Sequence, residues 1–167
     1  MNLLIKSNLL LILLTWANLS FAQTELQLVN IGDLKTTNGD IIKDGKVGYM
    51  TVGKLNADKS NVILWPSWFD GKSADIINHG ALTKIIDTTG FYIIAVDALT
   101  NGISSSPSNT ANFPDVSIRD MVNSQYKLLV NHLKINHLYA VMGVSFGGMQ
   151  TFEWLVAYPE FMDKAIP

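Results

Sequence analysis

The chain has 167 residues, of which 48% are hydrophobic and 16% charged, enough for one domain with a buried core. Twelve Lys and Arg against fourteen Asp and Glu give a formal net charge of −2 without a basic cluster, which argues against nucleic-acid binding. The sequence contains no Cys, so disulfides, thiolate metal sites and a Cys nucleophile are excluded. Small-molecule chemistry or simple binding remains.

The first 22 residues are predicted to form a signal peptide. Lys6 and the α-amino group give a positive start, residues 9–14 are an unbroken apolar run, and Ser20 and Ala22 are the small residues that a signal peptidase recognises. A membrane anchor is the alternative, but polar residues interrupt the run before it reaches the roughly 20 apolar residues that span a bilayer. We therefore expect residues 23–167 to be exported, to a bacterial periplasm or beyond, with no stable membrane anchor after cleavage.

Hydrophobic periodicity predicts alternating strands and helices. In chain order, we expect strands at 46–52 and 62–65, a helix at 75–87 that stops at Gly90, a strand at 91–96, a helix from 118 to about 133, a strand at 138–144, a helix from about 149 to 158, and the beginning of another strand at 161–166. This order predicts an α/β fold with a mostly parallel sheet flanked by helices.

Two local patterns support these boundaries. Ser117 and Asp120 have the spacing of a capping box, and the helix after them carries apolar residues at helical spacing, as an amphipathic helix does. The strands at 91–96 and 138–144 are too apolar to be half-exposed, so we expect them to be covered on both faces.

The candidate chemistry concentrates in Gly143-Val144-Ser145-Phe146-Gly147, between a buried strand and a helix. A serine at such a sharp turn has a strained backbone, and the flanking glycines avoid collisions of a Cβ with neighbouring backbone. Its hydroxyl then projects above the sheet, and the Phe146 N–H at the helix start is placed to stabilise an oxyanion. An ordinary tight turn is the alternative interpretation.

Four stretches carry a resemblance to a known family. They are Gly48-Tyr49 through Gly53-Lys54-Leu55-Asn56, Asn101-Gly102 through Ser106-Pro107-Ser108-Asn109, residues 113–122 (FPDVSIRDMV), and Gly143 through Gly147-Gly148-Met149-Gln150. Together they resemble the α/β-hydrolase superfamily, and specifically its homoserine O-acetyltransferase branch. The resemblance runs through most of residues 45–160 and covers the N-terminal portion of that fold.

The resemblance implies an acyl-enzyme mechanism at Ser145, which takes an acyl group from an ester or thioester and passes it to a hydroxyl or to water. It also implies that the loop after the strand at 62–65 gives a second oxyanion donor, and the alignment places the Trp68 backbone N–H there. The alternative for the indoles of Trp65 and Trp68 is packing at the rim of the sheet or in an acyl pocket. The implied substrate is a small-molecule acyl ester or acyl-CoA-type compound.

Two departures from the family favour an exported esterase over an amino-acid acyltransferase. Homoserine acetyltransferases normally have a His-Ala-Leu-Thr type loop where this chain reads Pro66-Ser67-Trp68-Phe69. Family members that make methionine precursors work in the cytoplasm, whereas this chain has a predicted signal peptide.

The general base is a third departure. In this fold the order along the chain is Ser, then Asp or Glu, then His, and no His follows Ser145. His132 and His137 are expected at the opposite edge of the sheet, as surface or helix-terminus residues. His79 is the one conceivable substitute, and Asp97, after the strand at 91–96, is interpreted as a loop carboxylate. No His pair has metal-ligand spacing with a third ligand, so we predict no metal and no cofactor.

The sequence therefore predicts the N-terminal part of an exported, serine-dependent α/β-hydrolase, truncated after the nucleophile helix. Two alternatives stay open. One is a catalytically inactive remnant that lacks the Asp and His of the triad. The other is an O-acetyltransferase that acts on an amino-acid hydroxyl.

Overall fold

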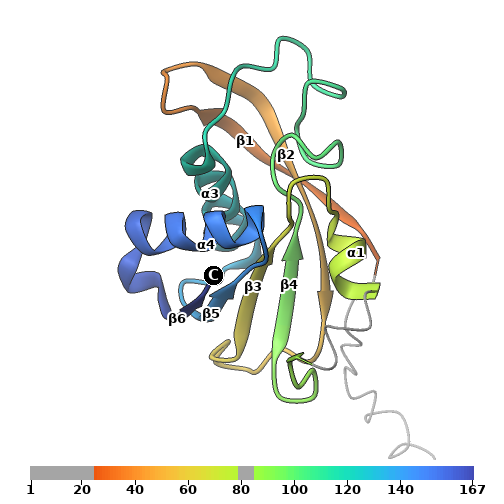
Figure 1. Ribbon diagram of the computed structural model, residues 1–167, viewed down its shortest axis with the longest axis vertical. Helices are drawn as coiled ribbons and strands as arrows, with labels where there is room; N and C mark the ends of the chain where they lie inside the picture. Colours follow the sequence, from red (N-terminus) through yellow and green to blue (C-terminus); the bar gives the residue numbers. More distant parts are fainter. Residues whose placement is uncertain (1–24, 79–84) are drawn as a thin grey trace, which may run out of the picture.

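The computed structural model describes residues 25–78 and 85–167, which form one six-stranded sheet with helices on its two faces (Figure 1). The predicted signal peptide lies outside the described residues. The strands are β1 (Gln27–Lys35), β2 (Ile41–Val52), β3 (Val62–Pro66), β4 (Tyr92–Val96), β5 (Leu138–Met142) and β6 (Met162–Ile166). The helices are α1 (Ser73–Asn78), α3 (Ile118–Lys127) with its π-helical continuation η1 (Leu128–Leu133), α4 (Phe146–Ala157) and the 3-10 turn η2 (Pro159–Phe161).

The strand order β1-β2-β4-β3-β5-β6 confirms the predicted α/β fold with a mostly parallel sheet. The pairs β4–β3, β3–β5 and β5–β6 are parallel, whereas β2 pairs antiparallel with both β1 and β4. β1 and the hairpin that it forms with β2 were not predicted from the sequence. A signal was available, because Asn38-Gly39 is a strong hairpin pattern and Gly39 has the positive φ (95°) that such a turn requires.

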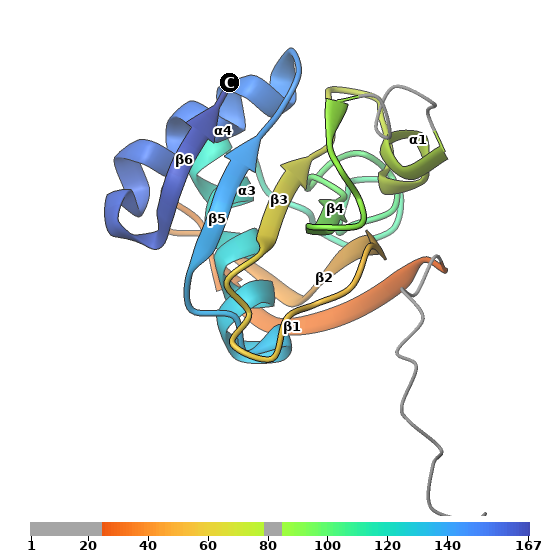
Figure 2. The ribbon, with the colours of Figure 1, turned by 90° about the horizontal axis from the view of Figure 1, so that it is seen from below.

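Alternate residues of the central strands face two apolar clusters, one on each side of the sheet. Leu64, Ile94 and Val141 face α3, η1 and α4, where Trp154 is fully buried. Ile63, Ile93 and Ala140 point the other way, into the cluster that includes Ile76 of α1. Figure 2 shows the sheet between these helices. The expectation that β4 and β5 are covered on both faces is confirmed.

The predicted element boundaries hold best where capping is strong. Ser117 caps α3 and accepts from the Asp120 N–H, while the Asp120 carboxylate accepts from the Ser117 N–H, so the capping box is confirmed. The helix predicted at 75–87 begins earlier, at Ser73. Residues 79–84 of this range lie outside the described residues, and residue 85 is helical while residue 86 is not, so the helix ends shortly before the predicted Asp87. Residues 88–90 then form a turn in which the Gly90 N–H donates to the Asp87 carbonyl.

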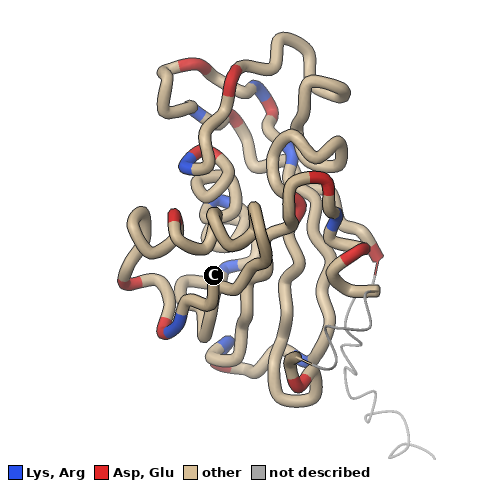
Figure 3. The backbone as a smooth tube through the Cα atoms, in the orientation of Figure 1, with Lys and Arg blue, Asp and Glu red and all other residues tan. Residues whose placement is uncertain are grey.

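Charged residues are spread over the described surface. Figure 3 shows Lys and Arg interspersed with Asp and Glu along the backbone, with no basic face. Within residues 25–78 and 85–167, no helix combines the length and the apolar character that crossing a bilayer requires.

Candidate active site

The turn between β5 and α4 has the strained geometry expected at a nucleophilic serine. Ser145 has φ 56° and ψ −120°, a backbone conformation that residues with a side chain rarely adopt. Glycine is required on both sides. A Cβ on Gly143 would lie 2.3 Å from the Gly147 carbonyl group, and a Cβ on Gly147 would lie 2.5 Å from the Pro66 carbonyl oxygen. The close approach of α4 to the end of β3 therefore depends on these glycines.

The Ser145 hydroxyl is not used to cap its helix. Ser117, at the same position of α3, has an extended backbone and accepts from the Asp120 N–H. Ser145 is exposed and makes no side-chain capping bond to α4. The difference follows from the positive φ, which turns the hydroxyl away from the first helical N–H groups. The hydroxyl is left open to solvent at the carboxyl edge of the sheet, where α/β folds bind ligands.

Two backbone N–H groups near this turn have no acceptor among the described residues. One belongs to Phe146, the first residue of α4, and the other to Trp68, in the loop after β3. The rings of Phe69 and Phe146 meet edge to face with centroids 5.9 Å apart, so the loop reaches the start of α4. Unpaired N–H groups at a helix start and a neighbouring loop are the components of an oxyanion hole.

The loop after β3 is held at both of its ends. The Ser67 N–H donates to the Val96 carbonyl, and the Ala98 N–H donates to the Ser67 hydroxyl at 3.1 Å. At the far end, the fully buried Asp97 carboxylate accepts from the Ser73 N–H (2.8 Å) and hydroxyl (2.7 Å). The residues between Ser67 and Ser73 therefore form a loop whose two ends are both fixed by hydrogen bonds.

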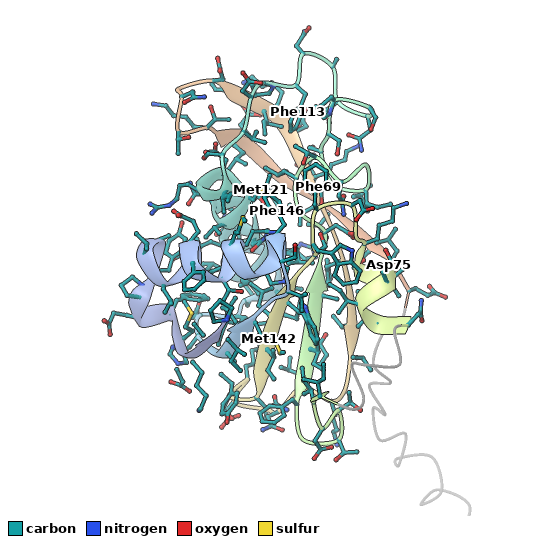
Figure 4. The ribbon with its side chains drawn as sticks, viewed as in Figure 1. Phe69, Asp75, Phe113, Met121, Met142 and Phe146 are labelled. Carbon is teal, nitrogen blue, oxygen red and sulfur yellow. The ribbon has the colours of Figure 1, made fainter. Side chains whose placement is uncertain are left out.

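Apolar side chains line the space beside the serine. Phe146 packs against the cluster that contains Met121, with Phe113 and Val116 at its edge. Figure 4 shows Phe69, Phe146 and Met121 next to one another at the start of α4. Phe69 itself is 76% exposed. The surface at the start of α4 is therefore apolar.

The two indoles pack as the alternative interpretation expected. Trp65 is buried in the cluster on the α1 side of the sheet, and Trp68 packs at its margin. A Cβ on Gly71 would lie 2.4 Å from the Trp68 ring, so the indole is seated on this glycine. The structure therefore assigns packing to the Trp68 side chain, while the donor role of its backbone N–H stays a prediction.

None of the histidines in the described part of the chain lies beside Ser145. His132 is exposed in η1, and His137 Nε2 lies 2.9 Å from an Asp163 carboxylate oxygen at the amino ends of β5 and β6. Since β5 has five residues, His137 and Ser145 are separated by roughly 17 Å at about 3.3 Å per residue. The prediction for these two residues is confirmed. His79, the suggested substitute base, lies outside the described residues.

Asp97 lies in the loop directly after β4, as the interpretation of a loop carboxylate expected. It is fully buried, and besides Ser73 it accepts from the Asn101 side chain at 2.8 Å. Its signal in the sequence was its position directly after a buried strand. In the described ranges, no three His, Cys, Asp or Glu side chains are grouped as a metal site would require.

Two buried glutamines contribute to the site and were not predicted from the sequence. Gln125 and Gln150 are fully buried and joined by a hydrogen bond of 2.6 Å between α3 and α4. A signal existed for Gln125, which stands three residues after Val122 on the apolar face of its helix. A polar residue on such a face must find a partner inside the protein.

Comparison with known proteins agrees with this fold. The family described as alpha/beta hydrolase fold matches residues 62–166. The chain is 38% identical over 160 residues to a probable esterase of Corynebacterium glutamicum, covering 89% of this chain and 46% of the esterase. It is 36% identical over 165 residues to a homoserine O-acetyltransferase of Methanococcoides burtonii, covering 81% and 32%.

A solved structure of an acetylester hydrolase from Corynebacterium glutamicum superposes with a TM-score of 0.76 at 37% identity, covering 83% of this chain and 42% of that one. The chain thus spans less than half the length of these relatives. The strained serine between β5 and α4, the sheet order and the family match over residues 62–166 lead to one assignment. The chain belongs to the α/β-hydrolase fold family.

Proposed function

We propose that the protein is a serine-dependent esterase that cleaves small acyl esters through an acyl-enzyme at Ser145. The observation that carries the proposal is the pairing of a strained, uncapped Ser145 with unpaired backbone N–H groups at Phe146 and Trp68. The exposed hydroxyl is the nucleophile, and the two N–H groups are the oxyanion donors.

In the first step, Ser145 Oγ attacks the carbonyl carbon of the ester. The Oγ–C bond forms, the bond to the leaving alkoxide breaks, and the serine proton passes through a general base to the leaving alcohol. A water molecule then attacks the acyl-enzyme, which releases the carboxylic acid and restores the hydroxyl. In each step negative charge develops on the former carbonyl oxygen, where the Phe146 and Trp68 N–H groups stabilise it.

The general base is the part of this mechanism that the described residues do not contribute. His132 and His137 lie at the far edge of the sheet, and the α/β-hydrolase order places the acid and the base after the nucleophile. We propose that the full-length protein supplies them from regions corresponding to the remaining length of the relatives. A protein without them would be the catalytically inactive form.

An esterase is favoured over an O-acetyltransferase by the loop after β3. The exposed Phe69 ring, which meets Phe146 edge to face, gives an apolar approach to Ser145, and relatives named as esterases support the same preference. O-acetyl transfer is the competing candidate activity, because the chain is also similar to a homoserine O-acetyltransferase. The predicted signal peptide leads us to propose that the enzyme works in the periplasm or outside the cell.

The test is covalent labelling of the full-length native protein with a fluorophosphonate, which reacts with activated serines. We expect one labelled site, lost in Ser145→Ala and retained in Ser117→Ala, which removes a hydroxyl from the other helix N-cap. Acetate release from simple acetyl esters should exceed acetyl transfer from acetyl-CoA to homoserine. Dominant transfer would favour the acetyltransferase, and a well-folded protein without any labelling would favour the inactive form.

A further inference from the structure

We propose that Gln150 is a positioning residue whose side-chain amide sets the direction of the Trp68 backbone N–H, at the end of a buried relay that begins at Trp154. The inference rests on the proposed function, because it concerns the oxyanion donors of that reaction.

The relay is a chain of hydrogen bonds that crosses from α4 to α3 and back. The Trp154 indole N–H donates to Gln125 Oε1 at 2.8 Å, and Gln125 Nε2 donates to Gln150 Oε1 at 2.6 Å. Gln150 Nε2 then donates to the Ser67 carbonyl at 2.9 Å. All four residues are fully buried, so water does not compete for these groups.

The direction of the relay is fixed by its two ends. An indole N–H only donates, so Gln125 must turn its oxygen toward Trp154 and its amide nitrogen toward Gln150. A backbone carbonyl only accepts, so Gln150 must turn its nitrogen toward Ser67. Each amide therefore has one orientation that satisfies both of its neighbours, and flipping either one would place two oxygens or two N–H groups against each other.

The last bond acts on the oxyanion donor because of peptide geometry. The Ser67 carbonyl and the Trp68 N–H belong to the same planar, trans peptide unit, so they point in opposite directions. Gln150 holds the carbonyl toward the core, and the Trp68 N–H is thereby directed out of it. Gln150 Nε2 also lies 3.3 Å from the Phe146 carbonyl, which ties the same side chain to the first turn of α4. One amide thus links the segments that carry both donors.

Removing the relay would loosen the donor without touching the substrate or the nucleophile. In Gln150→Met, the side chain keeps its length but gives the Ser67 carbonyl no N–H. In Gln125→Glu, a carboxylate accepts from Trp154 and faces the Gln150 oxygen, which favours the flipped Gln150 amide and takes the donor away from Ser67. The second variant acts from α3, two hydrogen bonds away from the loop.

The test measures steady-state kinetics of the full-length native protein with acetyl esters. We expect both variants to lower kcat by at least about ten-fold, toward the roughly 10²–10³-fold cost of losing one oxyanion donor, with little change in KM. The pH profile of kcat/KM should keep its midpoints, because the general base is unchanged. Ser124→Ala is the matched control, since it removes a buried side-chain bond to the Met121 carbonyl on α3 outside the relay, and it should keep the wild-type kcat.

A second measurement does not depend on activity, so it tests the inference even if the parent protein is inactive or a variant folds poorly. The one-bond ¹⁵N–¹H residual dipolar coupling of Trp68 should change in Gln125→Glu, while the couplings of β3 stay as in the parent. An unchanged coupling together with wild-type kcat in folded variants would overturn the inference. If the folded parent protein does not react with the fluorophosphonate but its Trp68 coupling still changes in Gln125→Glu, the proposed function is overturned instead. The positioning of Trp68 by Gln150 then still holds.

Discussion

The Asp97 carboxylate accepts both the backbone N–H and the hydroxyl of Ser73, at 2.8 and 2.7 Å, and so fastens the start of α1 to the end of β4. The Asn101 amide donates to the same carboxylate and also to the Gly71 carbonyl. A buried carboxylate with this many donors is satisfied without a cationic partner. The loop that carries Trp68 therefore ends at a fixed point.

Replacing this carboxylate with an amide should destabilise the protein. In Asp97→Asn, an NH₂ group replaces one of the two carboxylate oxygens, and it cannot accept a hydrogen bond from Ser73 or Asn101. We therefore expect the free energy of unfolding to fall by about 1–3 kcal/mol. Urea unfolding measures it. The matched control is Asp70→Asn, on the exposed apex of the same loop, which should change stability by less than about 0.5 kcal/mol. Equal effects of the two substitutions would contradict the anchoring role of Asp97.

The two glycines at the start of α4 should respond differently to a methyl group. A Cβ on Gly147 would lie 2.5 Å from the Pro66 backbone oxygen, whereas the nearest atom to a Cβ on Gly148 would be 3.4 Å away. We expect Gly147→Ala to cost about 1–3 kcal/mol or more through overpacking. Gly148→Ala should be neutral or stabilising by up to about 1 kcal/mol, since alanine favours a helix. Thermal and urea unfolding of the pair distinguish them, and a larger loss in Gly148→Ala would refute this geometry.

How much of this structure the sequence predicts depends on the range of the interactions. The capping box at Ser117 and the turn at Ser145 are local patterns, and both were located correctly. The pairing of β2 with β4 is not local, because it depends on how the hairpin folds back onto the sheet. The helix expected up to residue 87 ends by residue 86, and here the cause is local, because the Asp87 carboxylate accepts from the Thr89 N–H and hydroxyl in a turn that competes with the helix.

The candidate site divides in the same way. Ser145 and Phe146 follow from one strand–turn–helix pattern, and the geometry of this turn matches it. The roles of Gln150 and Asp97 depend on contacts between segments far apart in the chain, such as Gln150 with Ser67. Local spacing carries no information about such contacts. A buried polar residue on an apolar face is the one signal that a sequence gives of them.

The exposed end of the hairpin offers a prediction on pH. A hydrogen bond from the Lys43 ammonium, and to a lesser degree the Asp44 N–H, holds the pKa of Asp33 below its ordinary value. Because the carboxyl pKa is lower in the folded state, ionisation of Asp33 stabilises the folded protein at pH values above the ordinary pKa. This contribution disappears as the pH falls through the lowered pKa. Lys43→Met should raise the Asp33 pKa, as followed by NMR titration of its carboxyl carbon. Lys127→Met, which removes a weaker charge effect, should raise it less.

Asp120 should matter more to stability than the serine that it pairs with. Its buried carboxylate accepts from the Ser117 N–H and also from the Thr37 N–H at 2.7 Å, so it joins the cap of α3 to the turn between β1 and β2. Ser117→Ala should cost about 1 kcal/mol, the usual cost of losing an N-cap. Asp120→Ala should cost at least about 2 kcal/mol, because it leaves the part-buried N–H groups of Ser117 and Thr37 without their acceptor and also removes the bond from the Thr37 hydroxyl.

A double-mutant cycle isolates the tie between helix and hairpin. Thr37→Val removes the hydroxyl that donates to the Asp120 carboxylate at 3.1 Å. Combined with Asp120→Ala, it should show a coupling of about 0.5 kcal/mol or more in urea unfolding, as residues in direct contact do. Asp115→Ala, on the exposed stretch before the cap, should be additive with Thr37→Val. Additivity of Thr37→Val with Asp120→Ala would mean that Asp120 acts within α3 alone, and that the hairpin is held by its sheet pairing.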